Sequence, residues 1–314
     1  MTLVQLEYII AVDTWRHFST AAEQCFVTQP TLSMQIQKLE EELDVKIFDR
    51  SKHPVIPTEM GVEIIEQARS IIARRNNLLE SIQAKKGLLT GELRIGIIPT
   101  LAPYLLPLFV QSFAKKYPSV RLVVNEMMTE QIIARLREGK IDAGILVTPL
   151  HEKGIKEYIL FYEELMAYVS KRNAMYQKTY VLPEDIDPGK LWLLEEGHCF
   201  RSQIVNLCEL QKISRENSRF DYEAGSIETL RRMVEMNDGI TIIPELATLD
   251  MPLKQTQLIR HFKKPSPMRE VSLVVHRNQV KKRLVDMLRH EILHTIPEKI
   301  RKNKTQRIIP VDAY

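Results

Sequence analysis

The sequence predicts an α/β domain of two lobes, preceded by an α-helical winged helix-turn-helix and a long linker helix. Three observations support this fold class. Short amphipathic segments separated by a tight turn fill the first part of the chain. Residues 58–86 then carry one uninterrupted helical pattern, and from Gly91 onward apolar strands alternate with helices. Such alternation is typical of a parallel sheet covered by helices.

Composition narrows the class of protein. The chain has 314 residues, of which 44% are hydrophobic, enough for two or three domains with real cores. Since it has no apolar run near about 18 residues and no signal-peptide pattern, we expect a cytoplasmic protein with no membrane segment. Cytoplasmic thiols are kept reduced, so any disulfide here would be transient. The net charge of +4 says little about DNA, because residues 1–90 hold 10 Lys and Arg against 12 Asp and Glu.

The N-terminal segment predicts a helix-turn-helix. A first helix carries Leu6, Ile9 and Ile10 on one stripe, and a second begins near Ser19. Thr28 can cap a third helix whose first turn tolerates proline. Its outer face is small and polar, as expected of a helix that enters the major groove. An ordinary solvated helix is the alternative on pattern alone. The residues predicted to contact DNA are Gln29, Pro30, Thr31, Ser33, Met34, Gln35 and Lys38, followed by Arg50 and His53.

Residues 45–57 predict a wing, two short strands around a basic turn, in which Arg50, Lys52 and His53 would meet the phosphate backbone or minor groove. Cys25 is interpreted as a core residue that faces the apolar side together with Phe26. In the linker helix, apolar residues recur at steps of three and four, the pattern of a two-helix coiled coil.

The remaining chain predicts two α/β lobes joined by two crossings, an arrangement like that of periplasmic binding proteins, with a site between the lobes. Thr100 and Thr129 follow the first two strands, so their hydroxyls can converge at the carboxyl edge of the sheet. Each alone is more often a helix cap. The expected strands are 93–98, 120–124, 141–147, 165–169, 191–194, 220–223, 240–243 and 271–276, and the expected helices are 105–117, 129–138, 200–208, 227–236 and 281–295.

The predicted domain boundaries follow from these patterns. The basic tail is interpreted as a solvated end. The domains are 1–58 for the DNA-binding domain, 59–86 for the linker helix, 87–301 for the α/β domain (lobe I 87–161 and 268–301, lobe II 162–267) and 302–314 for the tail.

Two of the three cysteines, Cys199 and Cys208, lie within one segment. Arg201 or a protonated His198 would lower the pKa of Cys199 and make it reactive. Cys208 falls on the buried stripe of a predicted helix. Nine residues of helix place the two Cα atoms roughly 13 Å apart, whereas a disulfide needs about 7 Å, so oxidation would have to unwind the helix. The alternative is two unrelated cysteines, one of them buried in a core helix.

The run from Ala21-Ala22 through Gln29-Pro30-Thr31-Leu32-Ser33 to Asp49-Arg50 resembles the winged helix-turn-helix of the LysR family from end to end. Gly197-His198-Cys199-Phe200-Arg201 followed by Cys208 resembles the peroxide-sensing segment of a regulator of this family. The wing departs from the family pattern Leu-Thr-x-Ala-Gly at residues 56–61, and the tail beyond Arg301 is unmatched.

The resemblance implies an activator of oxidative-stress genes. It implies that hydrogen peroxide oxidises Cys199 and that Cys208 resolves the product to a disulfide. Because residues 98–107 also resemble this regulator, it implies that Thr100 and Thr129 orient the peroxide. The implied partners are promoter DNA, RNA polymerase and further copies of the chain, as a dimer that assembles to a tetramer, without a cofactor or metal.

Three other interpretations compete with this one. The first is a LysR-type regulator that binds a small organic effector between the lobes. A thiol enzyme is disfavoured, because the chain has no Cys-x-x-Cys and turnover does not need a DNA-binding domain. A zinc site built from His198, Cys199 and Cys208 has only three ligands at a poor spacing.

Overall fold

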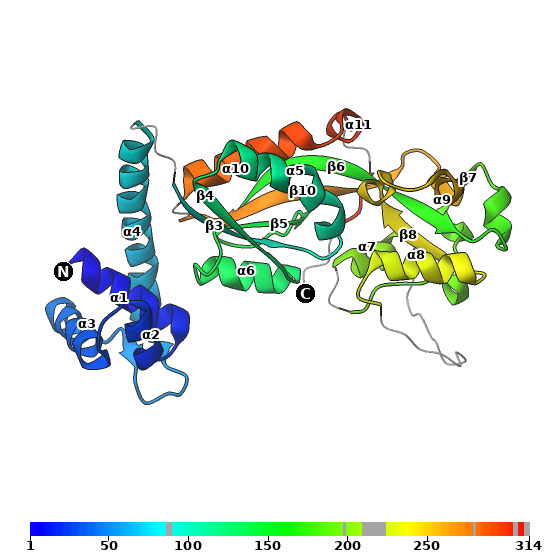
Figure 1. Cartoon of the computed structure of the whole chain (residues 1–314). Helices are drawn as coiled ribbons and strands as arrows, with labels where there is room; N and C mark the ends of the chain where they lie inside the picture. The colour runs from blue at the N-terminus through cyan, green and yellow to red at the C-terminus, as the bar shows by residue number, and fades with distance from the viewer. Residues whose placement is uncertain (86–89, 197–198, 209–223, 279–280, 304–306, 311–314) are drawn as a thin grey trace.

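The computed structural model describes residues 1–85, 90–196, 199–208, 224–278, 281–303 and 307–310 (Figure 1). A helical N-terminal domain is followed by one long helix and by two lobes that lie side by side. Within these ranges, no helix combines the length and the apolar character needed to span a bilayer.

The N-terminal domain contains the three predicted helices and the wing. The helices are α1 (Leu3–Trp15), α2 (Phe18–Gln24) and α3 (Gln29–Leu43), and the wing pairs β1 (Phe48–Asp49) with β2 (Ile56–Pro57) antiparallel. Thr28 caps α3 as predicted, with its hydroxyl accepting from the Thr31 amide. The cap of α2 is His17 rather than Ser19, because the imidazole Nδ1 accepts from the Thr20 amide.

The turn between α2 and α3 corrects one interpretation. Cys25 packs at the edge of the domain core, but Phe26 is 95% exposed and its φ is positive, at 56°. The left-handed backbone points the Phe26 ring out of the core, so the apolar pattern at this position did not predict burial.

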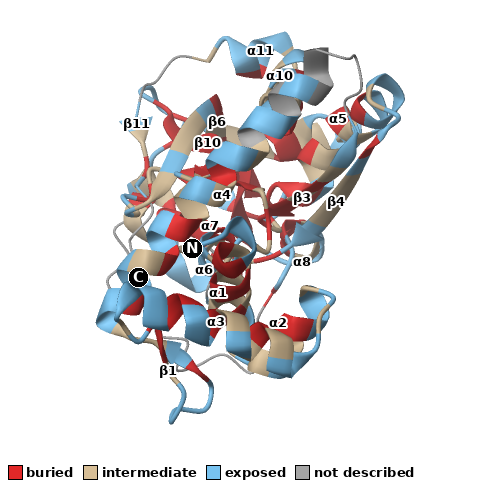
Figure 2. Ribbon diagram, turned by 90° about the vertical axis from the view of Figure 1, so that its left-hand side faces the viewer, coloured by how far each residue is buried: buried red, intermediate tan, exposed pale blue. Residues whose placement is uncertain are grey.

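The linker helix α4 (Glu59–Lys85) runs as predicted. Its first turns pack Ile65 and Ala68 into the core of the N-terminal domain. Figure 2 shows exposed residues along the rest of its length. Those exposed and apolar are Met60, Val62, Ile71, Leu78, Leu79 and Ile82. Residues 56–61 depart from the family pattern, but Thr58 still joins the start of this helix to the wing. Its hydroxyl accepts from the Gly61 amide at 2.9 Å and donates to the Lys46 carbonyl at 2.6 Å.

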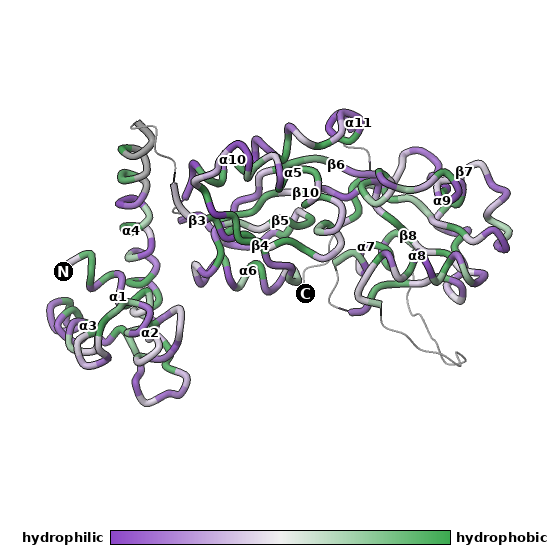
Figure 3. Tube along the Cα trace, in the orientation of Figure 1, coloured by the Kyte–Doolittle hydropathy of each residue, from purple (hydrophilic) through white to green (hydrophobic). Residues whose placement is uncertain are grey.

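In the described part of the chain, nine strands form one connected sheet that passes through both lobes, in the order β4-β3-β5-β10-β6-β9-β7, with β11 beside β10 and β8 beside β6. β3, β4 and β5 are parallel, as predicted for lobe I. Figure 3 shows the hydrophobic character of β6 and β8. The strands are β3 (Gly91–Ile97), β4 (Val120–Glu126), β5 (Ala143–Thr148), β6 (Ile155–Val169), β7 (Tyr180–Val181), β8 (Ile240–Pro244), β9 (Ile259–Phe262), β10 (Pro267–His276) and β11 (Arg307–Ile308).

Helices cover each lobe around its own hydrophobic cluster. Lobe I carries α5 (Ala102–Lys116), α6 (Thr129–Arg137), α10 (Lys282–Thr295) and α11 (Glu298–Arg301). Lobe II carries α7 (Cys199–Leu207), α8 (Ile227–Met236), α9 (Leu253–Thr256) and four short 3-10 turns, η1 (Ala174–Gln177), η2 (Pro183–Asp185), η3 (Pro188–Lys190) and η4 (Glu245–Thr248).

Two expectations about the lobes need correction, and a third cannot be compared with the structure. β6 starts at Ile155, ten residues before the prediction, because its first half pairs with β10 and tolerates charged residues on its solvent side. The strand expected at 191–194 is reduced to two isolated bridges, from Leu191 to Ile240 and from Leu194 to Ala224. The strand expected at 220–223 lies outside the described residues.

The C-terminal tail also differs from the expectation of a solvated end. Residues 307 and 308 form β11, which pairs parallel with Pro267 and Met268 of β10. The side chain of Ile309 is buried in the core of lobe II. Two apolar residues at the end of an otherwise basic segment, Ile308 and Ile309, therefore lie where the chain docks against the sheet.

Candidate functional site

Cys199 lies at the boundary between the two lobes. It is the first residue of α7 and belongs to the hydrophobic cluster of lobe I, whereas Phe200 and Ile204 of the same helix belong to that of lobe II. The cysteine is only 4% exposed. The start of α7 is therefore held by both lobes at once.

A buried arginine faces this boundary. Arg269 is 0% exposed and forms an ion pair at 2.7 Å with Glu163, its cross-strand partner in the register of β10 and β6. Its guanidinium also donates to the hydroxyl of Thr100 at 3.2 Å and to the Thr100 carbonyl at 3.3 Å. The same group lies 5.1 Å from the centre of the Phe200 ring. One cation thus contacts the hinge strands, the loop before α5 and the start of α7.

The pKa of Cys199 is raised above that of an ordinary cysteine, because burial disfavours the thiolate. Three groups oppose this effect: the charge of Arg269, the Thr129 side chain, and the backbone amides at the start of α7. The Thr129 hydroxyl is buried and has no partner of regular hydrogen-bond geometry in the described part of the chain, so we assign it the role of a donor toward the sulfur. Cys199 is therefore a neutral thiol in the reduced protein, and the groups around it can stabilise its thiolate when the proton leaves.

The four residues predicted around Cys199 have different outcomes. Thr100 contacts Arg269 and Thr129 acts on Cys199, so the structure brings both threonines to this site. The expectation that Arg201 favours the thiolate is wrong, because its guanidinium donates to the Leu194 carbonyl at 2.9 Å and the acting cation is Arg269. His198 lies outside the described residues.

Sequence reasoning missed Arg269 because it lies 70 positions from Cys199, on the strand that returns to lobe I. The sequence did contain one indication that Arg269 is buried and paired. The segment Pro267-Met268-Arg269-Glu270-Val271 places two charged residues inside an apolar strand, and a charge buried in a sheet needs a partner.

Cys208 lies at the other end of α7. Its amide donates to the Ile204 carbonyl at 3.0 Å, so helical hydrogen bonding continues to this residue. Burial raises its pKa to about 12, and Glu184 adds to the effect. Both cysteines are free, and a helix that joins them separates their Cα atoms by roughly 13 Å. The described residues contain no cluster of three or more side chains that could hold a metal.

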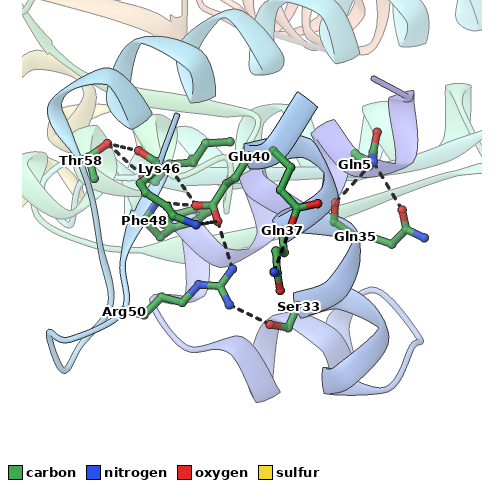
Figure 4. Close-up of polar contacts among 11 residues, drawn as sticks. Gln5, Ser33, Gln35, Gln37, Glu40, Lys46, Phe48, Arg50 and Thr58 are labelled. Atoms are coloured by element: carbon green, nitrogen blue, oxygen red, sulfur yellow. Dashed lines mark hydrogen bonds and ion pairs between the residues drawn. The ribbon is translucent and has the colours of Figure 1, made fainter. Parts of the chain in front are cut away.

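A second candidate surface is α3 with the wing (Figure 4). The buried carboxylate of Glu40 accepts from the amides of Ile47 at 2.8 Å and Phe48 at 3.3 Å, and from the Arg50 guanidinium at 3.3 Å. Arg50 also donates to the Ser33 hydroxyl at 3.0 Å. These bonds fix the wing against the helix.

The residues predicted to contact DNA are spread over this surface. Gln29, Pro30, Met34, Lys38 and His53 are exposed, and Thr31, Ser33 and Gln35 are partly exposed. Several of the predicted contacts already have partners within the domain, and the Thr31 hydroxyl lies 2.8 Å from that of Thr28. Arg50 binds Glu40 and Ser33, and Gln5 approaches the Gln35 carbonyl at 3.4 Å and its side-chain oxygen at 3.5 Å.

Two protein families match the chain. Residues 3–62 match the family described as bacterial regulatory helix-turn-helix protein, lysR family, and residues 86–295 match the LysR substrate binding domain. The matches cover both the helical N-terminal domain and most of the two-lobed domain.

Relatives of known name align over most of their length. The hydrogen peroxide-inducible genes activator of Haemophilus influenzae is 35% identical over 87% of this chain and 90% of its own. The DNA-binding transcriptional dual regulator OxyR of Escherichia coli K12 is 35% identical over 87% and 89%. The HTH-type transcriptional regulator EstR of Acinetobacter baylyi is 32% identical over 88% and 91%.

Solved structures agree with these relatives. Full-length OxyR from Pseudomonas aeruginosa, a cysteine-to-aspartate mutant, superposes with a TM-score of 0.77 at 31% identity and covers 97% of this chain and 99% of that one. A cysteine-to-serine mutant of OxyR from Corynebacterium glutamicum, described as bound to hydrogen peroxide, has a TM-score of 0.61 at 27% identity, over 95% and 94%.

We predict that the pKa of Cys199 lies above the ordinary value and rises further when Arg269 is removed. Replacing Arg269 by Met and Glu163 by Leu together removes the charge without leaving its partner buried alone. The measurement is the ultraviolet absorbance of the thiolate against pH in protein carrying Cys25→Ser and Cys208→Ser. Matched protein that also carries Cys199→Ser is subtracted to cancel the tyrosines.

The titration midpoint decides the electrostatic assignment. A midpoint at or below that of an ordinary cysteine, or one that stays the same without the ion pair, contradicts it.

Proposed function

The chain belongs to the LysR family of bacterial regulatory proteins, and from this premise we propose that it is a transcriptional regulator that binds promoter DNA and senses hydrogen peroxide through Cys199. The observation that carries the proposal is the position of Cys199 between the two lobes, beside a buried cation and a threonine hydroxyl. A change at this sulfur acts on a helix that both lobes hold.

The surface formed by α3 and the wing is the proposed DNA interface. The exposed Gln29 and Lys38 and the partly exposed Gln35 can reach base edges and phosphates in a major groove, and the tip of the wing can contact the phosphate backbone. The apolar face of α4 pairs two copies of the chain, since it exposes a helical seam that water disfavours. Two such dimers form a tetramer on the promoter, where the protein activates transcription by RNA polymerase.

The first chemical step is oxidation of Cys199. Its sulfur attacks one oxygen of hydrogen peroxide, an S–O bond forms and the O–O bond breaks. The departing hydroxide takes the thiol proton and leaves as water, and Cys199 becomes a sulfenic acid. Arg269 and the Thr129 hydroxyl stabilise the negative charge on sulfur as this proton departs.

The second step joins the two cysteines. The sulfur of Cys208 attacks that of the Cys199 sulfenic acid, the S–S bond forms, the S–O bond breaks, and a second water leaves with the Cys208 proton. Two thiols have then reduced one peroxide to two waters. No enzyme turnover, cofactor or metal is needed, and the protein acts in the cytoplasm, where reductants can restore the thiols.

This second step requires a change of structure. A disulfide brings the Cα atoms within about 7 Å, whereas the intact helix keeps them roughly 13 Å apart. α7 must therefore unwind, and because Phe200 and Ile204 are core residues of lobe II, that core must repack. The oxidised and reduced forms then differ at the surface of lobe II and in how copies of the chain pack together.

A second candidate function is the response to a small organic effector. A cavity of about 360 Å³ lies between α5 and lobe II, lined by Tyr104, Glu228, Arg231 and Gln255 among others. A regulator that uses this cavity keeps its response when Cys199 and Cys208 are both replaced by serine, whereas a peroxide sensor loses it.

We predict that Lys38→Ala weakens DNA binding to all sequences alike and lowers the salt slope by about 0.9 for the phosphate contact that is lost. Thermal stability stays the same, because Lys38 is exposed. Arg50→Ala lowers both DNA binding and stability, since it leaves the buried Glu40 without one of its partners. Fluorescence anisotropy over a salt series, on a duplex selected from a randomised pool, and thermal melting measure these effects.

Lys115→Ala, which removes an exposed lysine on α5, is the matched control and leaves both quantities unchanged. If Lys38→Ala keeps the full salt slope, the exposed face of α3 is not the DNA interface.

We predict that brief exposure to peroxide yields a linked peptide containing Cys199 and Cys208. Cys199→Ser abolishes it, whereas Cys208→Ser stops at a sulfenic acid that dimedone traps, because no second sulfur reaches it. Cys25→Ser is the matched control and oxidises normally. Mass spectrometry identifies the peptides, and DNA footprinting follows regulation in the same samples.

Two outcomes refute parts of the proposal. A footprint that changes without any linkage excludes the disulfide mechanism. Complete linkage with an unchanged footprint separates oxidation from regulation.

A further inference from the structure

We propose that the C-terminal strap, defined as residues 298–303 and 307–310, is a latch on α7 that holds the helix in its reduced form and must release before the disulfide can form. The inference rests on the proposed peroxide chemistry at Cys199. Gln203 and Ile309 are positioning residues of that switch, which act on α7 through a hydrogen bond and through core packing.

The first part of the strap is anchored where β6 passes from lobe I to lobe II. Lys299 forms an ion pair at 2.8 Å with Glu245, whose side chain is 4% exposed. Asn303 donates to the second oxygen of Glu245 at 2.9 Å and to the Tyr162 carbonyl of β6 at 3.1 Å. A buried carboxylate that is bonded twice to the strap gives it a fixed attachment beside the hinge.

The second part of the strap enters lobe II. After β11 pairs with the first residues of β10, the Ile309 amide donates to the Met268 carbonyl at 2.9 Å. The Ile309 side chain is 4% exposed and shares a hydrophobic cluster with Phe200, Ile204 and Leu207, the buried stripe of α7. The strap therefore supplies part of the core on which α7 rests.

One buried hydrogen bond joins the strap directly to α7. Gln203 lies in the middle of the helix and is 0% exposed, and its side-chain nitrogen donates to the Ile309 carbonyl at 2.7 Å. Within the described ranges its side-chain oxygen has no partner. An amide is costly to bury unless it is bonded, so the bond to the strap accounts for a polar residue at this core position.

These contacts couple the strap to the redox step. Gln203 lies between the two cysteines, so unwinding α7 moves its side chain and breaks the bond to Ile309. The same movement removes Ile204 and Leu207 from the hydrophobic cluster that they share with Ile309. The strap thus opposes the disulfide and sets how readily a sulfenic acid at Cys199 proceeds to the linked form. Loosening it favours oxidation without changing the first chemical step.

The test compares three variants of the full chain. Ile309→Ala removes the buried side chain, Gln203→Leu removes the hydrogen bond at similar volume, and Lys302→Ala removes an exposed charge from the strap as the matched control. In a glutathione redox buffer, the ratio of disulfide to dithiol is expected to rise roughly tenfold or more in Ile309→Ala, to rise less in Gln203→Leu, and to stay unchanged in the control. Thiol trapping and mass spectrometry measure the ratio.

Two further readouts separate the latch from the chemistry. In a Cys208→Ser background, Ile309→Ala forms the sulfenic acid at the unchanged rate; a changed rate overturns the inference, because it places the effect at the first step. In the reduced protein, trypsin cleaves after Arg307 faster in Ile309→Ala and Gln203→Leu, because a looser strap exposes that bond.

The outcomes distinguish the two proposals. If the unmodified protein forms no disulfide, the proposed function fails, and trypsin cleavage of the reduced variants still decides the latch. If the disulfide forms equally in all variants, or if Gln203→Leu leaves cleavage after Arg307 unchanged, the strap is not a latch.

Discussion

The buried ion pair between Arg269 and Glu163 is the interaction on which the rest of the structure depends. It joins β10 to β6 at the hinge, holds the loop of Thr100, and places a positive charge beside Phe200 and Cys199. Burial raises the pKa of Glu163, and the charge of Arg269 opposes that rise. Removing one partner of such a pair alone typically costs about 3–5 kcal/mol, so the loss of either charge by itself would disturb the hinge.

Next to this ion pair, α7 contacts three different parts of the protein along its length. Its first residue is packed in lobe I, its buried stripe is packed in lobe II, and the C-terminal strap closes over the middle of the helix. The short helix is therefore stabilised by three separate sets of contacts, one with each lobe and one with the strap. A covalent bond between its ends is incompatible with the helix, so a local oxidation becomes a change in how the lobes pack.

Periodicity and capping predicted much of this fold from sequence, and distance in the chain explains what was missed. The cap at Thr28 and the small, polar outer face predicted α3, and the apolar stripe assigned to residues 200–208 predicted the helix that follows Cys199. Arg269 and the docking of Ile309 were not predicted, because both reach α7 through the sheet from distant positions. Arg201 was predicted to favour the thiolate because it is close to Cys199 in the sequence. Its guanidinium instead donates to the Leu194 carbonyl, so proximity in sequence at a helix start does not bring a side chain to the sulfur.

The claim that oxidation unwinds α7 is tested most directly by hydrogen exchange. Amide exchange is compared between reduced and peroxide-treated protein, with peroxide-treated Cys199→Ser as the control for unrelated oxidation. We predict that the amides of residues 203–208, bonded within the helix in the reduced form, lose protection on oxidation while those of α8 keep theirs. Full protection of residues 203–208 in protein whose Cys199–Cys208 disulfide is complete would contradict it.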